Sequence, residues 1–84
     1  MEPKVVCKPS AFKHGCSFED IEWAFATARY DGMADEKDES KRLLIGFDSK
    51  GNPLEVLYNE SGDNTMNVFH AMACGNANFS LLTS

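Results

Sequence analysis

The residues best suited to chemistry near neutral pH are two histidines that lie far apart in the chain. His14 directly precedes a helix-start signal, and His70 lies within an apolar run. Because an imidazole titrates near physiological pH, each could serve as a general acid or base. The structural alternatives are the commoner ones: His14 could hold the preceding segment through a backbone hydrogen bond, and His70 could be a satisfied core histidine. We take both as candidate catalytic residues.

Two cations and a set of thiols are the remaining candidates. Lys13 adjoins the first histidine and Arg42 begins a strand-like run, so both are candidate phosphate or RNA contacts. For Arg42, an exposed ion pair with the preceding acidic residues is the commoner role. The two histidines, with Cys16 and Cys74, have suitable atoms for zinc, but the sequence lacks the C-x-x-C pairs of structural zinc sites. We therefore predict no metal site and no cofactor, and keep a small His/Cys metal-binding domain as an alternative.

The charge balance argues against tight nucleic-acid binding. The 84 residues carry a formal net charge of -5, whereas domains that bind nucleic acid usually carry a basic patch. Much of the acid lies in residues 31–40, which we expect to be a solvated loop or edge. The length suits one core, so residues 1–84 are predicted to form a single domain.

Cysteine usage and hydropathy bear on location. The chain has three cysteines, an odd number, and shows no recognisable signal peptide. It also has no apolar stretch near the ~20 residues that a membrane-spanning helix needs. These features predict reduced thiols, a cytoplasmic protein and no membrane association.

An amphipathic helix is predicted to begin after Ser17. Ser17 is a favourable N-cap, and Asp20 three residues later completes a capping signal. The residues that then recur at helical spacing form one apolar stripe: Ile21, Ala24, Phe25 and Ala28. Asp31 and Gly32 predict that the helix ends near residues 29–30. Trp23 lies off the stripe and could cover the N-terminal arm or a partner.

The second half of the chain predicts an antiparallel sheet. Apolar runs alternate with turn-forming stretches, and the runs are residues 42–47, 53–59 and 65–72. A further strand could run through residues 30–34, and a short one could begin at residues 5–6. The predicted fold class is α+β: an N-terminal amphipathic helix packed on a three- or four-stranded antiparallel sheet, with a possible short C-terminal helix over residues 77–82.

Alternation along the strands predicts which side chains meet the helix. The expected core sets are Leu43, Ile45 and Phe47 on one strand and Leu54, Val56 and Tyr58 on the next. Arg42, Glu55 and Asn67 would then face the other side of the sheet. The run over residues 65–72 is apolar at nearly every position, so its inward face stays undecided.

Three segments, taken in order, match a known pattern. They are KHGCS at residues 13–17, RLLIGFD continuing through GNPLEV within residues 42–56, and VFHAM at residues 68–72. This order resembles small actinobacterial proteins distantly related to the BrnT toxins of type II toxin–antitoxin systems. The resemblance implies a RelE/barnase-like fold and metal-independent cleavage of RNA, with the 2′-hydroxyl as nucleophile. It also implies an antitoxin that holds the toxin inactive.

The chain departs from that pattern in its last segment. BrnT-like toxins carry arginines on the last strand and just after it, whereas this chain has no Arg or Lys from Met66 onward. Loss of such cations weakens stabilisation of a phosphate transition state. The prediction is a toxin-like domain with weak or lost ribonuclease activity, bound by an antitoxin-like protein or by a second copy, with RNA as a weak ligand. The alternative is a non-catalytic interaction domain that uses apolar surface near Trp23 or Phe79.

Overall fold

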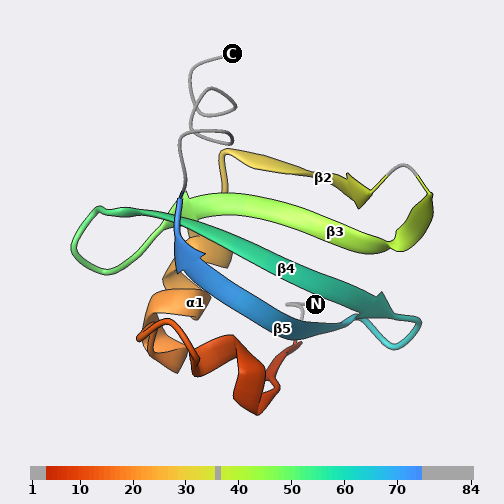
Figure 1. Cartoon of the computed structure of the whole chain (residues 1–84), viewed down its shortest axis with the longest axis horizontal. Helices are drawn as coiled ribbons and strands as arrows, with labels where there is room; N and C mark the ends of the chain where they lie inside the picture. Colours follow the sequence, from red (N-terminus) through yellow and green to blue (C-terminus); the bar gives the residue numbers. More distant parts are fainter. Residues whose placement is uncertain (1–3, 36, 75–84) are drawn as a thin grey trace.

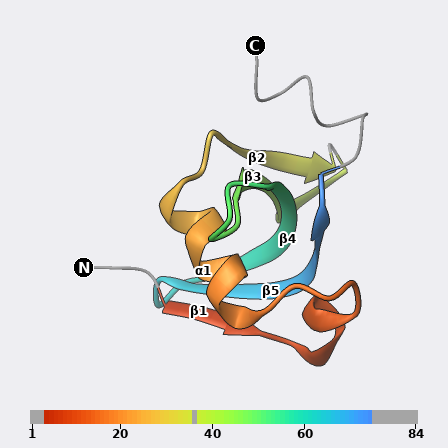
Figure 2. The ribbon, with the colours of Figure 1, turned by 90° about the vertical axis from the view of Figure 1, so that its left-hand side faces the viewer.

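Five strands form one sheet in the computed structural model, which describes residues 4–35 and 37–74. In chain order the elements are β1 (Lys4–Cys7), the 3₁₀ helix η1 (Pro9–Phe12), α1 (Phe18–Ala26), β2 (Tyr30–Asp35), β3 (Asp38–Phe47), β4 (Pro53–Ser61) and β5 (Thr65–Ala73). Across the sheet the order is β1-β5-β4-β3-β2, with β1 parallel to β5 and the other neighbours antiparallel. Figures 1 and 2 show α1 on the concave side of this curved sheet.

The predicted fold class is wrong in its strand count, its strand directions and its element order. The described part of the sheet has five strands and is mixed, and β1 precedes the helix. The cause is the N-terminal segment, in which Val5 lies opposite Met66 and Cys7 opposite Val68. Val5 and Cys7 pack against the core from this position. Because β1 and β5 are far apart in the sequence, no turn motif between them predicts this pairing. The predicted C-terminal helix lies outside the described residues.

The start of α1 is as predicted. Ser17 Oγ accepts a hydrogen bond from the Asp20 N–H at 3.1 Å, and Asp20 Oδ2 accepts one from the Ser17 N–H at 3.3 Å. This reciprocal pair is a capping box, which satisfies two backbone donors at the helix N-terminus. Gly15, with φ of +86°, turns the chain from η1 toward this cap.

The predicted end of α1 is wrong, because the helix stops at Ala26. Thr27 ends it: its Oγ1 donates to the Trp23 carbonyl at 2.7 Å and accepts from the Phe47 N–H at 2.9 Å. The second bond joins the helix C-terminus to the end of β3. Ala28, expected on the apolar stripe, therefore lies beyond the helix and is exposed.

The β3–β4 register decides which side chains face α1. Leu44 lies opposite Val56 and Gly46 lies opposite Leu54. Directly paired residues point to the same side of an antiparallel sheet. The predicted β4 set of Leu54, Val56 and Tyr58 is confirmed as core, since all three are buried in the cluster beneath the helix.

The predicted β3 set is wrong in its face, although Leu43 and Ile45 are buried as a core prediction requires. Leu44 and Gly46 face α1, so Leu43, Ile45 and Phe47 lie on the opposite face with Glu55. Arg42, expected on that opposite face, instead shares the helix face with Tyr58. A one-residue offset of this kind moves every side chain of a strand to the other side.

The core beneath α1 draws on η1, α1, β3, β4 and β5. Its buried members are Ala11, Ile21, Ala24, Leu44, Leu54, Val56, Tyr58, Met66, Val68 and Ala71. Phe25 adds an edge-to-face contact with Tyr58, with ring centroids 5.1 Å apart. In the described part of the chain, no helix combines the length and apolarity needed to cross a bilayer.

Candidate functional site

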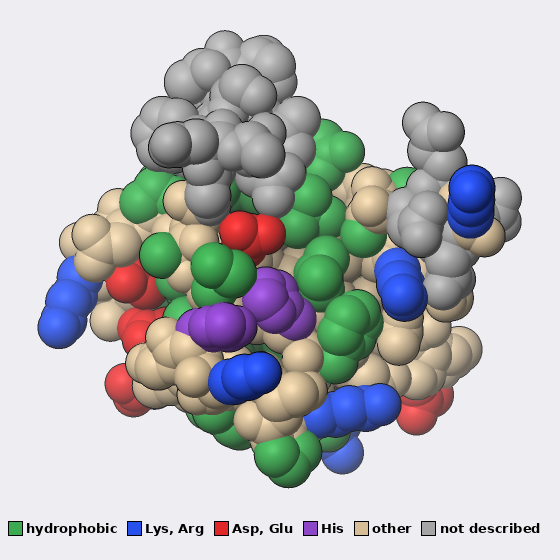
Figure 3. Space-filling model, viewed as in Figure 1, with side chains coloured by type: hydrophobic (Ala, Val, Ile, Leu, Met, Phe, Trp, Pro, Cys, Tyr) green, Lys and Arg blue, Asp and Glu red, His purple; other side chains and the backbone are tan. Residues whose placement is uncertain are grey.

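The structure brings the two candidate histidines into contact. The ring centroids of His14 and His70 lie 5.3 Å apart, with the ring planes at 71° to each other. This is an edge-to-face arrangement. His14 is exposed and His70 is half-buried, and Figure 3 shows the two rings side by side at the surface.

A β-bulge in β5 directs His70 to this surface. Tyr58 pairs with Val68, and Leu57, the residue before Tyr58 in β4, pairs with His70. Phe69 is therefore the extra residue, without a partner in β4. Without that insertion His70 would share the buried face of Val68, by strict alternation. With it, His70 lies on the face away from α1, and Ala71 returns to the core. The bulge thus settles which face His70 takes.

The segment that carries His14 is held beside the same bulge. The Lys8 N–H donates to the Val68 carbonyl at 2.9 Å, which continues the β1–β5 pairing by one residue. Ser10 Oγ donates to the Phe69 carbonyl at 2.7 Å. These two bonds place η1 along the edge of β5 and carry His14 to its partner ring. Sequence reasoning missed Ser10 and Phe69, since nothing local marks either as a positioning residue.

Neither imidazole takes part in a hydrogen bond or ion pair with the atoms that the structure describes. The structural role considered for His14, a hydrogen bond to a backbone carbonyl, is not found there. Lys13 adjoins His14 and is exposed, and Figure 3 shows Lys or Arg side chains next to the two rings. The surface therefore presents two adjacent imidazoles beside positive charge.

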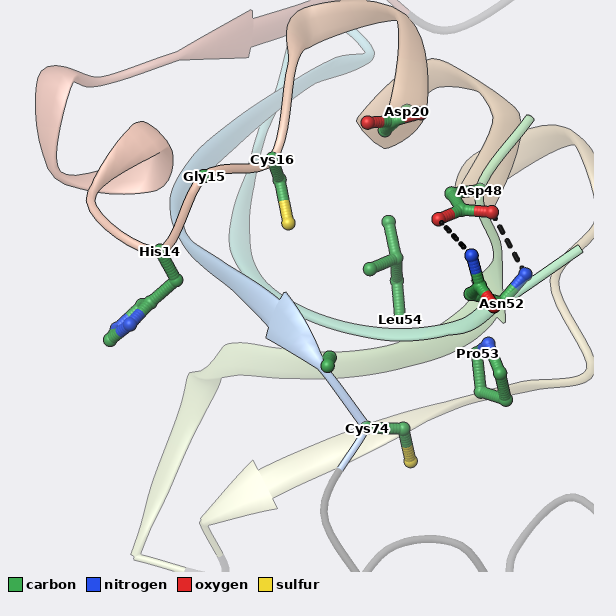
Figure 4. Close-up of a pocket in the computed structure, with 10 residues that line it drawn as sticks. His14, Gly15, Cys16, Asp20, Asp48, Asn52, Pro53, Leu54 and Cys74 are labelled. Carbon is green, nitrogen blue, oxygen red and sulfur yellow. Dashed lines mark hydrogen bonds between the residues drawn. The ribbon is translucent and has the colours of Figure 1, made fainter. Parts of the chain in front are cut away.

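A hollow of about 530 Å³ lies next to His14, between the start of α1, the β3–β4 turn and the end of β5. Its lining is His14, Gly15, Cys16, Asp20, Asp48, Asn52, Pro53, Leu54, Ala73 and Cys74. Figure 4 shows Cys16 projecting into the hollow, while the His14 ring points away from its centre. His14 thus lies at the rim rather than inside.

The two carboxylates of this hollow, Asp20 and Asp48, accept hydrogen bonds from nearby residues. Desolvation raises the pKa of Asp20, but hydrogen bonds from Ser17 and Ser49 outweigh it and lower the pKa overall. The backbone hydrogen bond from Asn52 lowers the pKa of Asp48, whose Oδ1 accepts that bond at 2.8 Å. Both groups are therefore ionised at neutral pH, and the hollow disfavours phosphate.

The three thiols are protonated at neutral pH in this setting. Burial raises the pKa of Cys16, and the charges of Asp20 and Asp48 raise it further. Burial likewise raises the pKa of Cys7 and of Cys74. A raised pKa keeps a thiol protonated at neutral pH, whereas the thiolate is the reactive and ligating form.

The alternative metal set is not assembled in the described structure. Among the side chains that the structure describes, no three of the His, Cys, Asp or Glu type are placed to hold a metal ion. The two histidines meet each other without Cys16 and Cys74 completing a coordination shell around them.

Arg42 is not brought to the histidines. It lies on the helix face of the sheet, where its Nε is 3.2 Å from Asp31 Oδ1 and 3.3 Å from Tyr58 Oη. Tyr58 Oη donates to the same carboxylate oxygen at 2.8 Å. His70 lies on the opposite face. The pairing of Arg42 with the acidic run is therefore what the structure contains, and its phosphate role stays a prediction.

The Arg42–Asp31–Tyr58 network predicts a loss of stability at alkaline pH. Burial, followed by the hydrogen bond to Asp31, raises the pKa of Tyr58 to about 12. An unfolded tyrosine titrates near ~10, so the unfolded chain releases this proton first. By linkage, the resulting stability is complete below about pH 10 and is lost as the pH rises from about 10 to 12. Urea denaturation across that range should show the loss in wild type and a smaller loss in Tyr58→Phe.

Tyr30→Phe provides the matched control, because it removes the other tyrosine of the chain. It should retain the alkaline loss that wild type shows. Equal pH dependence in wild type and Tyr58→Phe would rule out Tyr58 as its source.

The chain was compared with protein-family models, with curated proteins and with solved structures, and none of them matches it.

Proposed function

We propose that this chain is a cytoplasmic, toxin-like ribonuclease domain of a type II toxin–antitoxin module, with His14 and His70 as its acid–base pair. The observation that carries the proposal is the contact between these two rings on an open surface, 5.3 Å between centroids. The order of the KHGCS, RLLIGFD and VFHAM segments supports the same reading. An antitoxin-like protein would be the partner.

The chemistry needs no metal ion. One neutral imidazole accepts the proton of the RNA 2′-hydroxyl as that oxygen attacks the adjacent phosphorus. The other, protonated, imidazole donates its proton to the 5′-oxygen as the P–O bond breaks, which leaves a 2′,3′-cyclic phosphate and a 5′-hydroxyl. Lys13, next to His14, is the cation available to offset charge on the phosphate.

The activity is expected to be low. A phosphate transition state needs several well-placed donors, and the last strand contributes none from Lys or Arg. Asp20 and Asp48, both ionised, lie in the hollow beside His14. Their field opposes the approach of an RNA backbone.

The test is cleavage of a labelled RNA by the purified protein, with EDTA present. His14→Ala and His70→Ala should each lower the rate by about 10²-fold or more, as expected for loss of a general acid or base. Lys13→Ala should lower it as well. Lys50→Ala is the matched control, since this exposed lysine lies in the β3–β4 turn, and it should retain activity.

Growth provides a second measurement. Expression of wild type without a partner should slow growth, and the two histidine variants should not. A wild-type protein that is harmless and leaves RNA intact would refute the proposal, as would cleavage that survives loss of both histidines.

A further inference from the structure

The outward face of α1 presents an aromatic side chain among acids. Trp23 is 50% exposed, while Ile21 and Ala24 on the other side of the helix are fully buried. Glu19, Glu22, Trp23 and Ala26 line a hollow of about 380 Å³ on this face. The helix therefore packs with one side and leaves Trp23 exposed on the other.

The spacing of these residues suits a cation. Glu19 and Trp23 are four residues apart, so they are neighbours on the helix surface. The face of an indole attracts Arg and Lys side chains, and Trp is the strongest such partner. Adjacent carboxylates add charge-assisted hydrogen bonds to the same group. Within the described residues, Glu19 and Glu22 form no ion pair or hydrogen bond that would occupy them.

We propose that this face docks a basic segment of a protein partner, with an Arg or Lys side chain seated on Trp23 between Glu19 and Glu22. Ala26, which lines the same hollow, leaves room for the stem of that side chain. The net charge of -5 favours a cationic partner over nucleic acid at long range. Trp and Arg are also the side chains that most often dominate interface energies.

This surface is independent of the proposed ribonuclease site. His70 lies on the sheet face away from α1, and neither histidine lines the hollow beside Trp23, so docking on the helix needs neither of them. The docking proposal can thus fail or succeed without the cleavage proposal.

The test uses Trp23 as its own reporter, because it is the sole tryptophan of the chain. The probe is a synthetic helical peptide of about four turns, carrying Arg and Leu four residues apart on one face. Titration into the full chain should change the tryptophan fluorescence saturably. Glu19→Gln with Glu22→Gln should weaken binding about tenfold or more, as should about 0.5 M salt. Circular dichroism checks that the variant is folded, and His14→Ala should bind as wild type does.

Two control ligands make the proposal falsifiable. The same peptide with Glu in place of Arg should not bind, and a single-stranded RNA should leave the fluorescence unchanged. No saturation up to about 1 mM peptide, equal binding by the acidic peptide, equal binding by the double Gln variant, or tighter binding of RNA would each overturn it.

Discussion

Gly46→Ala is expected to remove about 3 kcal/mol or more of the unfolding free energy. A Cβ at this position would lie 2.8 Å from the Ala24 carbonyl carbon and 2.9 Å from its Cα, with the carbonyl oxygen closer still. All three are backbone atoms of α1, so no side-chain rotation relieves the overlap. The helix would have to move off the sheet at its point of closest approach.

The helix has little freedom to make that move. Thr27, just after α1, accepts a hydrogen bond from the Phe47 N–H and donates to the Trp23 carbonyl. Lifting α1 from Gly46 would stretch this connection and expose Ile21, which is fully buried. The loss is a large fraction of the stability typical of a domain of this size.

Urea denaturation measures the effect, and Gly62→Ala is its matched control. A Cβ at Gly62 meets nothing within 4 Å, so this variant should stay within about 0.5 kcal/mol of wild type. If Gly46→Ala proved as stable as Gly62→Ala, α1 would not lie against β3 as described.

The same glycine shows how far the fold could be predicted. Features that depend on neighbouring residues could be predicted from the sequence. The Ser17–Asp20 capping box and the Asp48–Asn52 turn both form at the predicted positions. The face of β3 that meets the helix could not be predicted in this way. Residues 43–47 are nonpolar at odd and at even positions, so alternation does not distinguish the two faces. A glycine inside a strand does mark close backbone approach. That rule would have assigned the Gly46 face to the helix.

For the candidate site, the sequence was enough to select His14 and His70 as candidates, but not to predict that their rings are in contact. His14 and His70 were selected by side-chain chemistry alone. Their contact depends on parallel pairing between β1 and β5 and on the bulge at Phe69. Both arise from tertiary packing, and neither has a turn motif or a repeat that marks it in the chain. For Arg42 the expected position at the start of a strand is wrong, because β3 begins at Asp38, and its contacts with Asp31 and Tyr58 depend on the pairing of three strands.

Ile21→Ala is the second change with a large expected effect, a loss of about 2–5 kcal/mol. Ile21 is fully buried, and α1 otherwise contributes only Ala24 and the partly buried Phe25 to the core. A helix of nine residues has little stability of its own, so tertiary contacts through Ile21 must hold it. Removing three side-chain carbons would leave a cavity between α1 and the sheet, because the capping box and the Thr27 bonds restrain both helix ends from closing it.

Ile21→Val is the control, because it makes a smaller deletion at the same buried position. It shows whether the loss of unfolding free energy scales with the volume removed. It deletes one methylene and should cost about 0.5–1.5 kcal/mol. Fluorescence of Trp23, on the same helix, should follow α1 during urea denaturation alongside circular dichroism of the whole chain. In Ile21→Ala the Trp23 transition should come first, since the helix loses its main contact while the β-ladders remain paired. Coincident transitions together with a loss no greater than that of Ile21→Val would mean that α1 is held chiefly by its ends, through Ser17 and Thr27.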